Sequence, residues 1–223
     1  MKIVALMPMK GNSERVPEKN LKPFRGRPLY QIVLNELVKS KYIDKIIVNT
    51  DSKVIENSIL QDYGKKVVIH HRPEALLGDT VSMNRIIDHD IQKESADLYI
   101  QTHSTNPLLK IETLDEAIKK MLDSMHMYDS IFSVTRMNTR LYDKDGNPYN
   151  HNPEQLLRTQ DLDPLYEENS NFYIFTKESF ANAGGKRIGL NPLMFEIDKL
   201  EAVDIDEPQD FIIAEVLHGL LRN

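Results

Sequence analysis

A loop near the start of the chain, KGNSERVPEKN (residues 10–20), follows the apolar run KIVALMP and gathers residues that could bind an anion. Three of them are cations, Lys10, Arg15 and Lys19. Three others are small residues that favour a turn, Gly11, Asn12 and Ser13. The cations are spaced so that they can surround a polyphosphate, and the turn can direct backbone N–H groups toward it. The patterns G-x-x-x-x-G-K-[ST] and G-x-G-x-x-G are absent, which excludes a Walker A loop and a dinucleotide-binding loop.

The charge of the chain is distributed unevenly. The 223 residues carry a net charge of −6, yet residues 1–30 contain seven Lys or Arg against two Glu, a net charge of +5. An acidic chain is a poor general binder of nucleic acid, so we expect no nucleic-acid partner. The basic start is either a solvated face or a local anion site on a protein that otherwise repels anions.

Composition excludes several other classes of site. The chain has no cysteine, so it has no disulfide framework, thiolate metal site or cysteine nucleophile. No apolar stretch approaches the roughly 20 residues of a membrane span, and the start MKIVALMPMKGN is too quickly charged for a secretory signal. We therefore expect a cytoplasmic protein with no membrane partner.

Apolar runs alternate with helical periodicities over the first 136 residues. The runs predict strands at 2–8, 45–51, 66–71, 97–103 and 130–136, and the periodicities predict helices at about 28–39, 54–63, 82–94 and 111–122. This alternation is typical of an α/β fold with a mainly parallel sheet flanked by helices. Ligands bind beyond the carboxyl ends of such strands, so we expect the loops after residues 8, 51, 71 and 103 to line the site.

The alternation breaks over residues 136–170, where the turn sequence DGNP and a stretch without clear periodicity indicate an inserted hairpin or arm. In DKDGN the glycine comes too early for a calcium-binding loop, which favours a turn. Strands are predicted for NFYIF (171–175), PLMFEI (192–197) and LEAVDID (200–206), and a last helix from Pro208. We expect one domain, residues 1–223, that contains the arm.

The segment PMKGNSERVPEKNLKPFRGRPL (8–29) resembles the N-terminal signature of the acylneuraminate cytidylyltransferases, the CMP-sialic acid synthetase family related to the Kdo cytidylyltransferases. That signature reads A-R-x-G-S-K-R-[IL]-P-x-K-N and continues to a G-[KR]-P-L that opens a helix. Further matches follow in the family's order: VNTDS (48–52), HRPEALLGDTVSM (71–83), HSTNPLL (103–109), EENSNFYIF (167–175) and VDID (203–206). The resemblance thus covers nearly the whole chain.

The resemblance implies a Rossmann-like nucleotidyltransferase fold whose inserted arm makes a homodimer. It implies transfer of CMP from CTP to the anomeric hydroxyl of a sialic-acid-like 2-keto-3-deoxy sugar acid, with Mg²⁺ and release of pyrophosphate. Lys10, Arg15 and Lys19 would bind the triphosphate and leaving pyrophosphate. The other nucleotide-binding candidates are Gly11, Asn12, Ser13, Asn20, Arg72, Val81 and Ser82, and the sugar-binding candidates are His103, Asn106, Arg158, Asn169 and Tyr173.

The resemblance also assigns the metal to Asp204 and Asp206. Two residues apart on a strand, their carboxylates would lie on one face, and Mg²⁺ takes few carboxylates beside phosphate and water oxygens. The alternative is that Asp206 caps the helix that begins near Pro208. In the family the metal can also activate the attacking hydroxyl, so a separate general base is not required.

Several roles stay open at this point. Asp51 would either bond near the ribose or cap the next helix, Asp79 would fix its loop, and Arg158 would bind the sugar carboxylate or form a surface or dimer-interface ion pair. The adjacent His70 and His71 would point to opposite faces of a strand, which argues against a shared metal.

Three departures from the family pattern concern the substrate: Lys10 replaces Arg, Glu14 replaces Lys and His103 replaces Gln. They leave the sugar open among sialic, legionaminic, pseudaminic and Kdn-type acids. The alternatives are a nucleotidyltransferase for Kdo, a sugar phosphate or another polar metabolite, and an inactive nucleotide-binding homologue.

Overall fold

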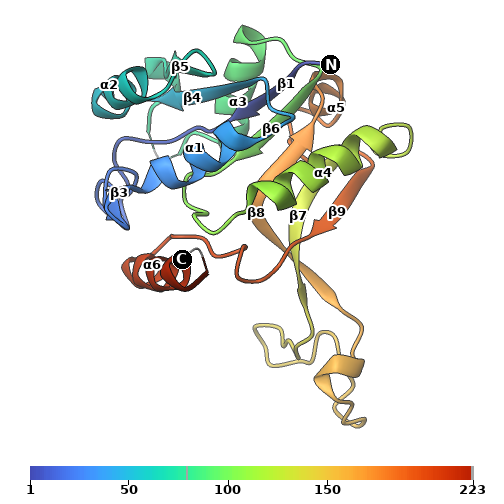
Figure 1. Cartoon of the computed structure of the whole chain (residues 1–223). Helices are drawn as coiled ribbons and strands as arrows, with labels where there is room; N and C mark the ends of the chain where they lie inside the picture. The colour runs from blue at the N-terminus through green and yellow to red at the C-terminus, as the bar shows by residue number, and fades with distance from the viewer. Residues whose placement is uncertain (79, 222–223) are drawn as a thin grey trace.

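A seven-stranded sheet organises the computed structural model, which describes residues 1–78 and 80–221 (Figure 1). The strand order is β5-β4-β1-β6-β8-β7-β9. The strands are β1 (Ile3–Leu6), β4 (Lys45–Thr50), β5 (Val67–His71), β6 (Leu98–Thr102), β7 (Ser130–Met137), β8 (Leu165–Phe175) and β9 (Pro192–Glu196). All neighbours pair in parallel except β8, which is antiparallel to both β6 and β7. The predicted α/β fold with a mainly parallel sheet is confirmed.

Helices cover both faces of the sheet. They are α1 (Leu29–Lys39), α2 (Lys53–Asp62), α3 (Met83–Lys93), α4 (Ile111–Ser124), α5 (Lys177–Asn182) and α6 (Pro208–Leu221). Successive strand residues point to opposite faces: Ile3 and Ala5 of β1 pack with α1, α2 and α4, whereas Val4 and Leu6 pack with α3 and α5. All four residues of β1 are buried, which explains its continuous apolar run.

Helix α6 closes the carboxyl-end side of the fold over a separate small core. Its Phe211 packs edge-to-face on Phe24, and both lie with Leu29 and Ile205 in one apolar cluster. Phe24 belongs to a short hairpin, β2 (Pro23–Phe24) with β3 (Arg27–Pro28), whose turn residues Arg25 and Gly26 have φ of 50° and 80°. Positive φ at both central residues is typical of a two-residue hairpin turn.

The segment between β7 and β8 extends away from the sheet as an arm (Figure 1). Its base is the antiparallel pair of Arg136 with Tyr166 and Met137 with Leu165. Within it, the DGNP region forms the predicted turn, because the Asp143 carboxylate accepts from backbone N–H groups of residues 145 and 147. A short 3₁₀ helix, Thr159–Asp161, precedes β8. The part of the chain described here contains no helix both long enough and apolar enough to cross a bilayer.

The structure differs from the predicted local elements in three places. LEAVDID is not a strand: residues 203–206 are irregular, and Ile205 makes one backbone bond, donating to Thr105 O at 3.0 Å. Strand β8 starts at Leu165 rather than at residue 171, because its first half pairs with β7 in the arm. Helix α5, only six residues long, was not predicted; a reciprocal capping box between Thr176 and Ser179 stabilises its start.

Candidate active site

A cavity of about 430 Å³ lies beyond the carboxyl ends of β1 and β6, where the fold class predicts a ligand. It is bounded by the loops after β1, β5 and β6 and by the segment before α6. Many of the predicted site residues line it: Lys10, Ser13, Arg15, Lys19, Asn20, Arg72, Val81, His103, Asp204 and Asp206. Residues from both ends of the sequence therefore meet at one place.

A larger cavity, about 760 Å³, lies between α3 and α5. Its lining includes Arg85, Asp88, Lys177 and Phe180 but none of the residues predicted to carry chemistry. We place the candidate active site in the smaller cavity, because size alone does not indicate chemistry and the predicted cations and carboxylates converge there.

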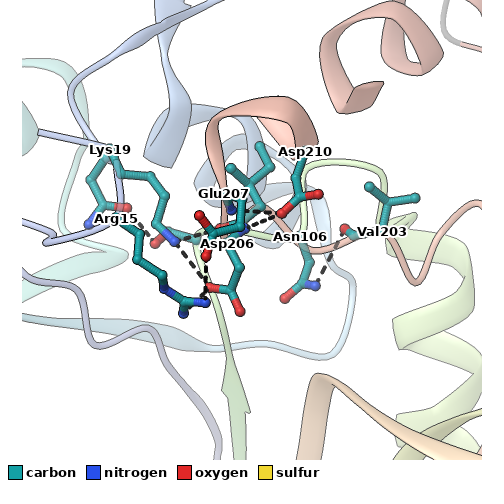
Figure 2. Close-up of polar contacts among 10 residues, drawn as sticks. Arg15, Lys19, Asn106, Val203, Asp206, Glu207 and Asp210 are labelled. Atoms are coloured by element: carbon teal, nitrogen blue, oxygen red, sulfur yellow. Dashed lines mark hydrogen bonds and ion pairs between the residues drawn. The ribbon is translucent and has the colours of Figure 1, made fainter. Parts of the chain in front are cut away.

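An ion-pair cluster forms one wall of the site (Figure 2). Arg15 Nη2 lies 2.8 Å from Asp206 Oδ1, and Lys19 Nζ lies 3.4 Å from the same oxygen. Arg15 Nη1 also contacts Glu207 at 3.3 Å, and the Lys19 ammonium donates to the Ile205 carbonyl. The negative charge of Asp206 raises the pKa of Arg15. The cations of the loop after β1 are thus held against the carboxylate before α6.

The alternative role of Asp206 as the cap of α6 is not observed. The carboxylate of Asp210 instead folds back on the helix start and accepts from the backbone N–H groups of Asp206, at 3.1 Å, and Glu207, at 2.7 Å (Figure 2). A carboxylate in the first helical turn also interacts favourably with the helix dipole. The side chain of Asp206 is therefore directed to the cations.

Asp204 carries a carboxylate oxygen that the protein itself leaves unsatisfied. Its Oδ1 atom is buried and, among the described residues, has no hydrogen-bond partner. Burial raises the pKa of Asp204, the charge of Asp206 raises it further, and a hydrogen bond with Thr105 opposes both. Such an oxygen, paired with a second carboxylate two residues away, fits a divalent cation.

These two aspartates fit Mg²⁺ better than a metal held by protein alone. Within residues 1–78 and 80–221, no group of three or more His, Asp or Glu could hold a metal ion. Mg²⁺ characteristically binds one or two carboxylates and completes its shell with substrate phosphate and water oxygens. Asp204 and Asp206 supply that number of carboxylates beside the cations that could bind the phosphates.

The turn after β1 does not present its N–H groups as the sequence suggested. Gly11 N–H donates to Asp51 Oδ1 at 2.7 Å, and Ser13 N–H donates to Asn12 Oδ1 at 3.0 Å. A Cβ at residue 11 would lie 2.9 Å from Ser52 Cβ, so close packing against the next loop requires glycine. Asp51 therefore fixes the turn, and Ser52, not Asp51, caps α2.

Asn20 and Arg72 line the cavity, but their described donors are used within the protein. Asn20 Nδ2 donates to the Lys10 carbonyl at 2.8 Å and Asn20 Oδ1 accepts from Ser104 at 2.7 Å, which joins the loops after β1 and β6. Arg72 Nε donates to Asn49 Oδ1 at 2.8 Å, and its Nη2 donates to two backbone carbonyls. Burial lowers the pKa of Arg72. Both side chains shape the pocket by fixing its walls.

The nucleotide-binding candidates Val81 and Ser82 have different positions. Val81 lines the cavity. Ser82 caps α3, since its hydroxyl accepts from Asn84 N–H at 3.3 Å. Asp79, which was expected to fix this loop, lies outside the described residues.

A second cavity of about 490 Å³ adjoins the first at the base of the arm, and both are lined by Ser170 and Asp204. The sugar candidate Asn169 lines this second cavity and donates to Thr135 Oγ1 at 2.9 Å. Asn106 is fully buried and lines neither cavity; its Oδ1 has no partner among the described residues. The two cavities are therefore adjacent and share part of their walls.

Ser170 is placed by an irregularity in β8. The β7–β8 register shifts between Phe132 and Val134, and Ser170 has a φ of 58°. Bulges of this kind re-aim side chains beside active sites. Ser170 thereby reaches both cavities, and its hydroxyl lies 3.1 Å from the hydroxyl of Tyr173.

Tyr173 is almost fully buried, and its hydroxyl donates to Glu168. Burial raises the pKa of this phenol. Tyr173 does not line either cavity, but it contacts Ser170 and Glu168, which do.

Arg158 is not brought to the site within the chain. Its side chain is 73% exposed on the arm and pairs with both oxygens of Asp161, at 2.7 and 3.0 Å. This is the ion-pair alternative weighed for Arg158 from the sequence.

Sequence reasoning missed Arg187, a partly buried arginine before β9. It lies over the Tyr173 ring, 3.9 Å from its centroid, and donates to Gln101 Oε1. No pattern marked Arg187, because KRIG lies outside every segment of the resemblance and has no clear periodicity.

His103 lines the main cavity as an uncharged imidazole. Burial lowers its pKa from 6.5 to about 4, and the positive charges of Arg187 and Lys19 contribute, against the opposing effect of Asp206. A neutral imidazole has one donor and one acceptor nitrogen. At neutral pH His103 can therefore bond to neutral groups of a ligand without adding charge.

The parallel sheet, the cationic loop after β1 and the aspartate pair before α6 together define the class of nucleotidyltransferases. Comparison with known proteins specifies the family: residues 4–210 match the cytidylyltransferase family model, and the chain belongs to that family. The resemblance found in the sequence is thereby confirmed.

The relatives activate several acidic sugars, according to their names. The chain is 32% identical over 224 residues to N-acylneuraminate cytidylyltransferase A of Danio rerio, covering 96% of the chain and 50% of that protein. It is 29% identical to CMP-N,N'-diacetyllegionaminic acid synthase of Legionella pneumophila, covering 99% and 97%. The chain spans about half the length of the first curated relatives it matches.

Solved structures of low sequence identity share the fold. CMP:2-keto-3-deoxy-manno-octonic acid synthetase complexed with CTP superimposes with a TM-score of 0.72 at 15% identity, covering 99% of both chains. The 4-diphosphocytidyl-2C-methyl-D-erythritol synthase of Anaerococcus prevotii gives a TM-score of 0.67 at 13% identity, covering 100% of this chain and 99% of its own. At these identities the likeness supports the fold alone.

Proposed function

We propose that this protein transfers CMP from CTP to the anomeric hydroxyl of a sialic-acid-like 2-keto-3-deoxy sugar acid and releases pyrophosphate. The observation that carries the proposal is the convergence of Arg15, Lys19, Asp204 and Asp206 on one cavity of a cytidylyltransferase fold. Curated relatives are named for this reaction with N-acylneuraminate and legionaminic acid derivatives, which supports the substrate class.

In the proposed reaction the sugar's anomeric oxygen forms a bond to the α-phosphorus of CTP as the bond to the bridging β-phosphate oxygen breaks. The anomeric hydroxyl loses its proton and pyrophosphate leaves with the electron pair of the broken bond. Such transfers depend on in-line positioning and stabilisation of charge. Lys10, Arg15 and Lys19 would bind the triphosphate and the departing pyrophosphate.

Mg²⁺ is part of the proposal, with Asp204 and Asp206 as its protein ligands. When bound, it would neutralise phosphate charge and lower the pKa of the attacking hydroxyl. Asp206 is paired with Arg15 and Lys19. Binding of a triphosphate would give these cations a new anionic partner, which would leave the Asp206 carboxylate for the metal.

The sugar would occupy the cavity at the base of the arm, next to the nucleotide. Its lining contains Asn169, Ser170, Glu168 and Thr135, which offer donors and acceptors for hydroxyl groups. This position would bring the sugar to Asp204, the residue shared with the nucleotide cavity. The alternative substrates, Kdo or a sugar phosphate, would also have to bind where the two cavities meet.

The test is pyrophosphate release from CTP with Mg²⁺, measured across a panel of sialic, legionaminic, pseudaminic, Kdn and Kdo acids. We expect release with one acid and a loss of roughly 100-fold or more in Asp206→Asn. The matched control is Asp123→Asn, an exposed aspartate of α4 paired with Lys119, which should keep wild-type activity. Bound CTP without release for any acid would favour a sugar phosphate substrate or an inactive homologue.

A further inference from the structure

We propose that Arg187 binds the carboxylate of the sugar acid, an inference that rests on the proposed function and specifies its substrate site. Three observations support it: Arg187 contacts residues that adjoin the site, it has no carboxylate partner among the described residues, and Arg158 is paired elsewhere.

The sheet register places Arg187 next to residues that adjoin the site, although Arg187 itself lines neither cavity. Gln101 of β6 pairs directly with Tyr173 of β8, so their side chains lie next to each other on one face. His103 follows Gln101 by two residues, beyond the end of β6, at the cavity. Arg187 bonds to Gln101 and lies over the Tyr173 ring. Its guanidinium therefore lies at the Gln101 end of the polar row that Gln101 and His103 form.

Arg187 has charge and donors that the protein does not satisfy. No carboxylate of the described residues lies within ion-pair distance, and its described hydrogen bond uses only one of five N–H donors. The nearest acidic influence, Glu168, is hydrogen-bonded to the Tyr173 hydroxyl. Burial lowers the pKa of Arg187, and the charges of Tyr173 and Glu168 oppose this effect.

A carboxylate is the ligand that fits these features. A guanidinium binds carboxylate by two parallel hydrogen bonds, and stacking on an aromatic ring fixes its plane for that contact. The triphosphate has its own cations at Lys10, Arg15 and Lys19. The remaining anionic group of the proposed substrates is the carboxylate of the sugar acid.

Arg158, for which binding of this carboxylate was one of the predicted roles, already pairs with a carboxylate of the protein. Its guanidinium makes the two-bond contact with Asp161, on the surface of the arm. Arg187 differs in being partly buried, in acting on the charge of His103, and in having no ion-pair partner within residues 1–78 and 80–221.

The experiment compares steady-state kinetics of Arg187→Met, Arg187→Lys and Arg158→Met, using the acid that the wild type turns over best. We expect Arg187→Met to raise the KM for the sugar acid roughly 30-fold and to leave the KM for CTP within about twofold. Arg187→Lys should recover part of the loss, because it restores charge without the fork. Arg85→Met, an exposed arginine of α3, is the matched control and should behave as the wild type.

A substrate analogue without the carboxylate distinguishes carboxylate binding by Arg187 from a purely structural role of this residue. The wild type should bind the carboxamide of the same sugar roughly 30-fold more weakly than the acid, with carboxamide affinity measured as inhibition. The Arg187→Met enzyme should bind the acid and the carboxamide about equally. An unchanged acid-over-amide preference in Arg187→Met, or the full effect in Arg158→Met instead, would overturn the inference. Failure of the wild type to turn over any sugar acid would overturn the proposed function itself.

Discussion

At the residue scale, the central feature is a pair of aspartates with unequal surroundings. Asp206 is partly exposed and lies between Arg15 and Lys19, whereas Asp204 has a buried oxygen with no partner in the described structure. Buried charged groups that lack hydrogen-bond partners usually lower the stability of the fold, and they occur mostly at functional sites. Because their surroundings differ, we expect different effects from replacing Asp204 and Asp206.

Asp204→Asn should stabilise the metal-free protein while it lowers activity. The folded-state pKa of Asp204 is raised, so the ionised form at neutral pH is disfavoured by folding, and an uncharged amide removes that cost. We expect a gain of about 1 kcal/mol in the free energy of unfolding by urea at pH 7 with a chelator. Mg²⁺ with CTP should stabilise the wild type more than the variant; a variant that is less stable without metal would contradict this account.

His103 should make stability depend on pH. Its pKa is about 4 in the folded protein and 6.5 ordinarily, so between these values the unfolded chain binds more protons. Stability should therefore be fully retained above pH 6.5 and fall as the pH drops from 6.5 toward 4. His103→Gln should lose this part of the pH dependence in chelator-treated protein.

The free energy of unfolding at pH 7, 6 and 5 measures the effect. The matched control is His126→Gln, which removes an exposed histidine after α4 and should follow the wild type. Parallel curves for the wild type and His103→Gln would show that folding does not lower the pKa of His103.

At the element scale, the site depends on loops joined by few side chains. Asn20 links the loops after β1 and β6 through two hydrogen bonds, to Lys10 and Ser104, and it is buried. Asn20→Ala should lower the free energy of unfolding by about 2 kcal/mol, because it leaves buried partners unsatisfied. Asn12→Ala in the same loop is exposed and should cost less than about 0.5 kcal/mol; equal costs for the two variants would refute the linking role.

The elements themselves could largely be predicted from local patterns. The helices that became α1 to α4 and the strands β1, β4, β5 and β6 have strong apolar periodicities, and their bounds agree with the structure within a few residues. The antiparallel direction of β8 and its extension into the arm depend on pairing with distant strands, which no local pattern carries. VDID has the composition of a strand, but no neighbouring strand is in place to pair with it.

The candidate site, like the fold, could be predicted from the sequence only where a local pattern marks it. The cation loop and the aspartates could be found because ordered motifs mark them. The hydrogen bonds that occupy Gly11 and Asn20, and the approach of Arg187 to Tyr173, arise from tertiary packing of segments distant in sequence. Single residues without a motif, such as Arg187, were therefore outside the reach of sequence reasoning.

At the scale of the whole molecule, the arm exposes large apolar side chains to solvent. They are Tyr142, Tyr149, Leu156 and Leu157, with exposed fractions of 58%, 71%, 89% and 47%. Apolar groups gathered on a projecting segment usually mark an interface. We propose that the arm makes a homodimer.

Replacement of residues 139–163 by a short turn should convert a dimer into a monomer, as measured by sedimentation equilibrium. A variant with Lys at residues 156 and 157 tests the same surface without shortening the chain, and it should weaken association. The sheet should stay folded in both, since the arm base at residues 136, 137, 165 and 166 is kept. An unchanged dimer in both variants would place the interface elsewhere.

CMP transfer is measured most directly by ³¹P NMR of CTP, Mg²⁺ and the preferred sugar acid with the wild-type protein. We expect loss of the three CTP signals and equal growth of one phosphodiester signal and of pyrophosphate, and we expect neither change with Asp206→Asn. Formation of free CMP with pyrophosphate would show hydrolysis rather than transfer. Unchanged CTP with every acid, in protein that binds CTP, would contradict the assignment of this site to CMP transfer.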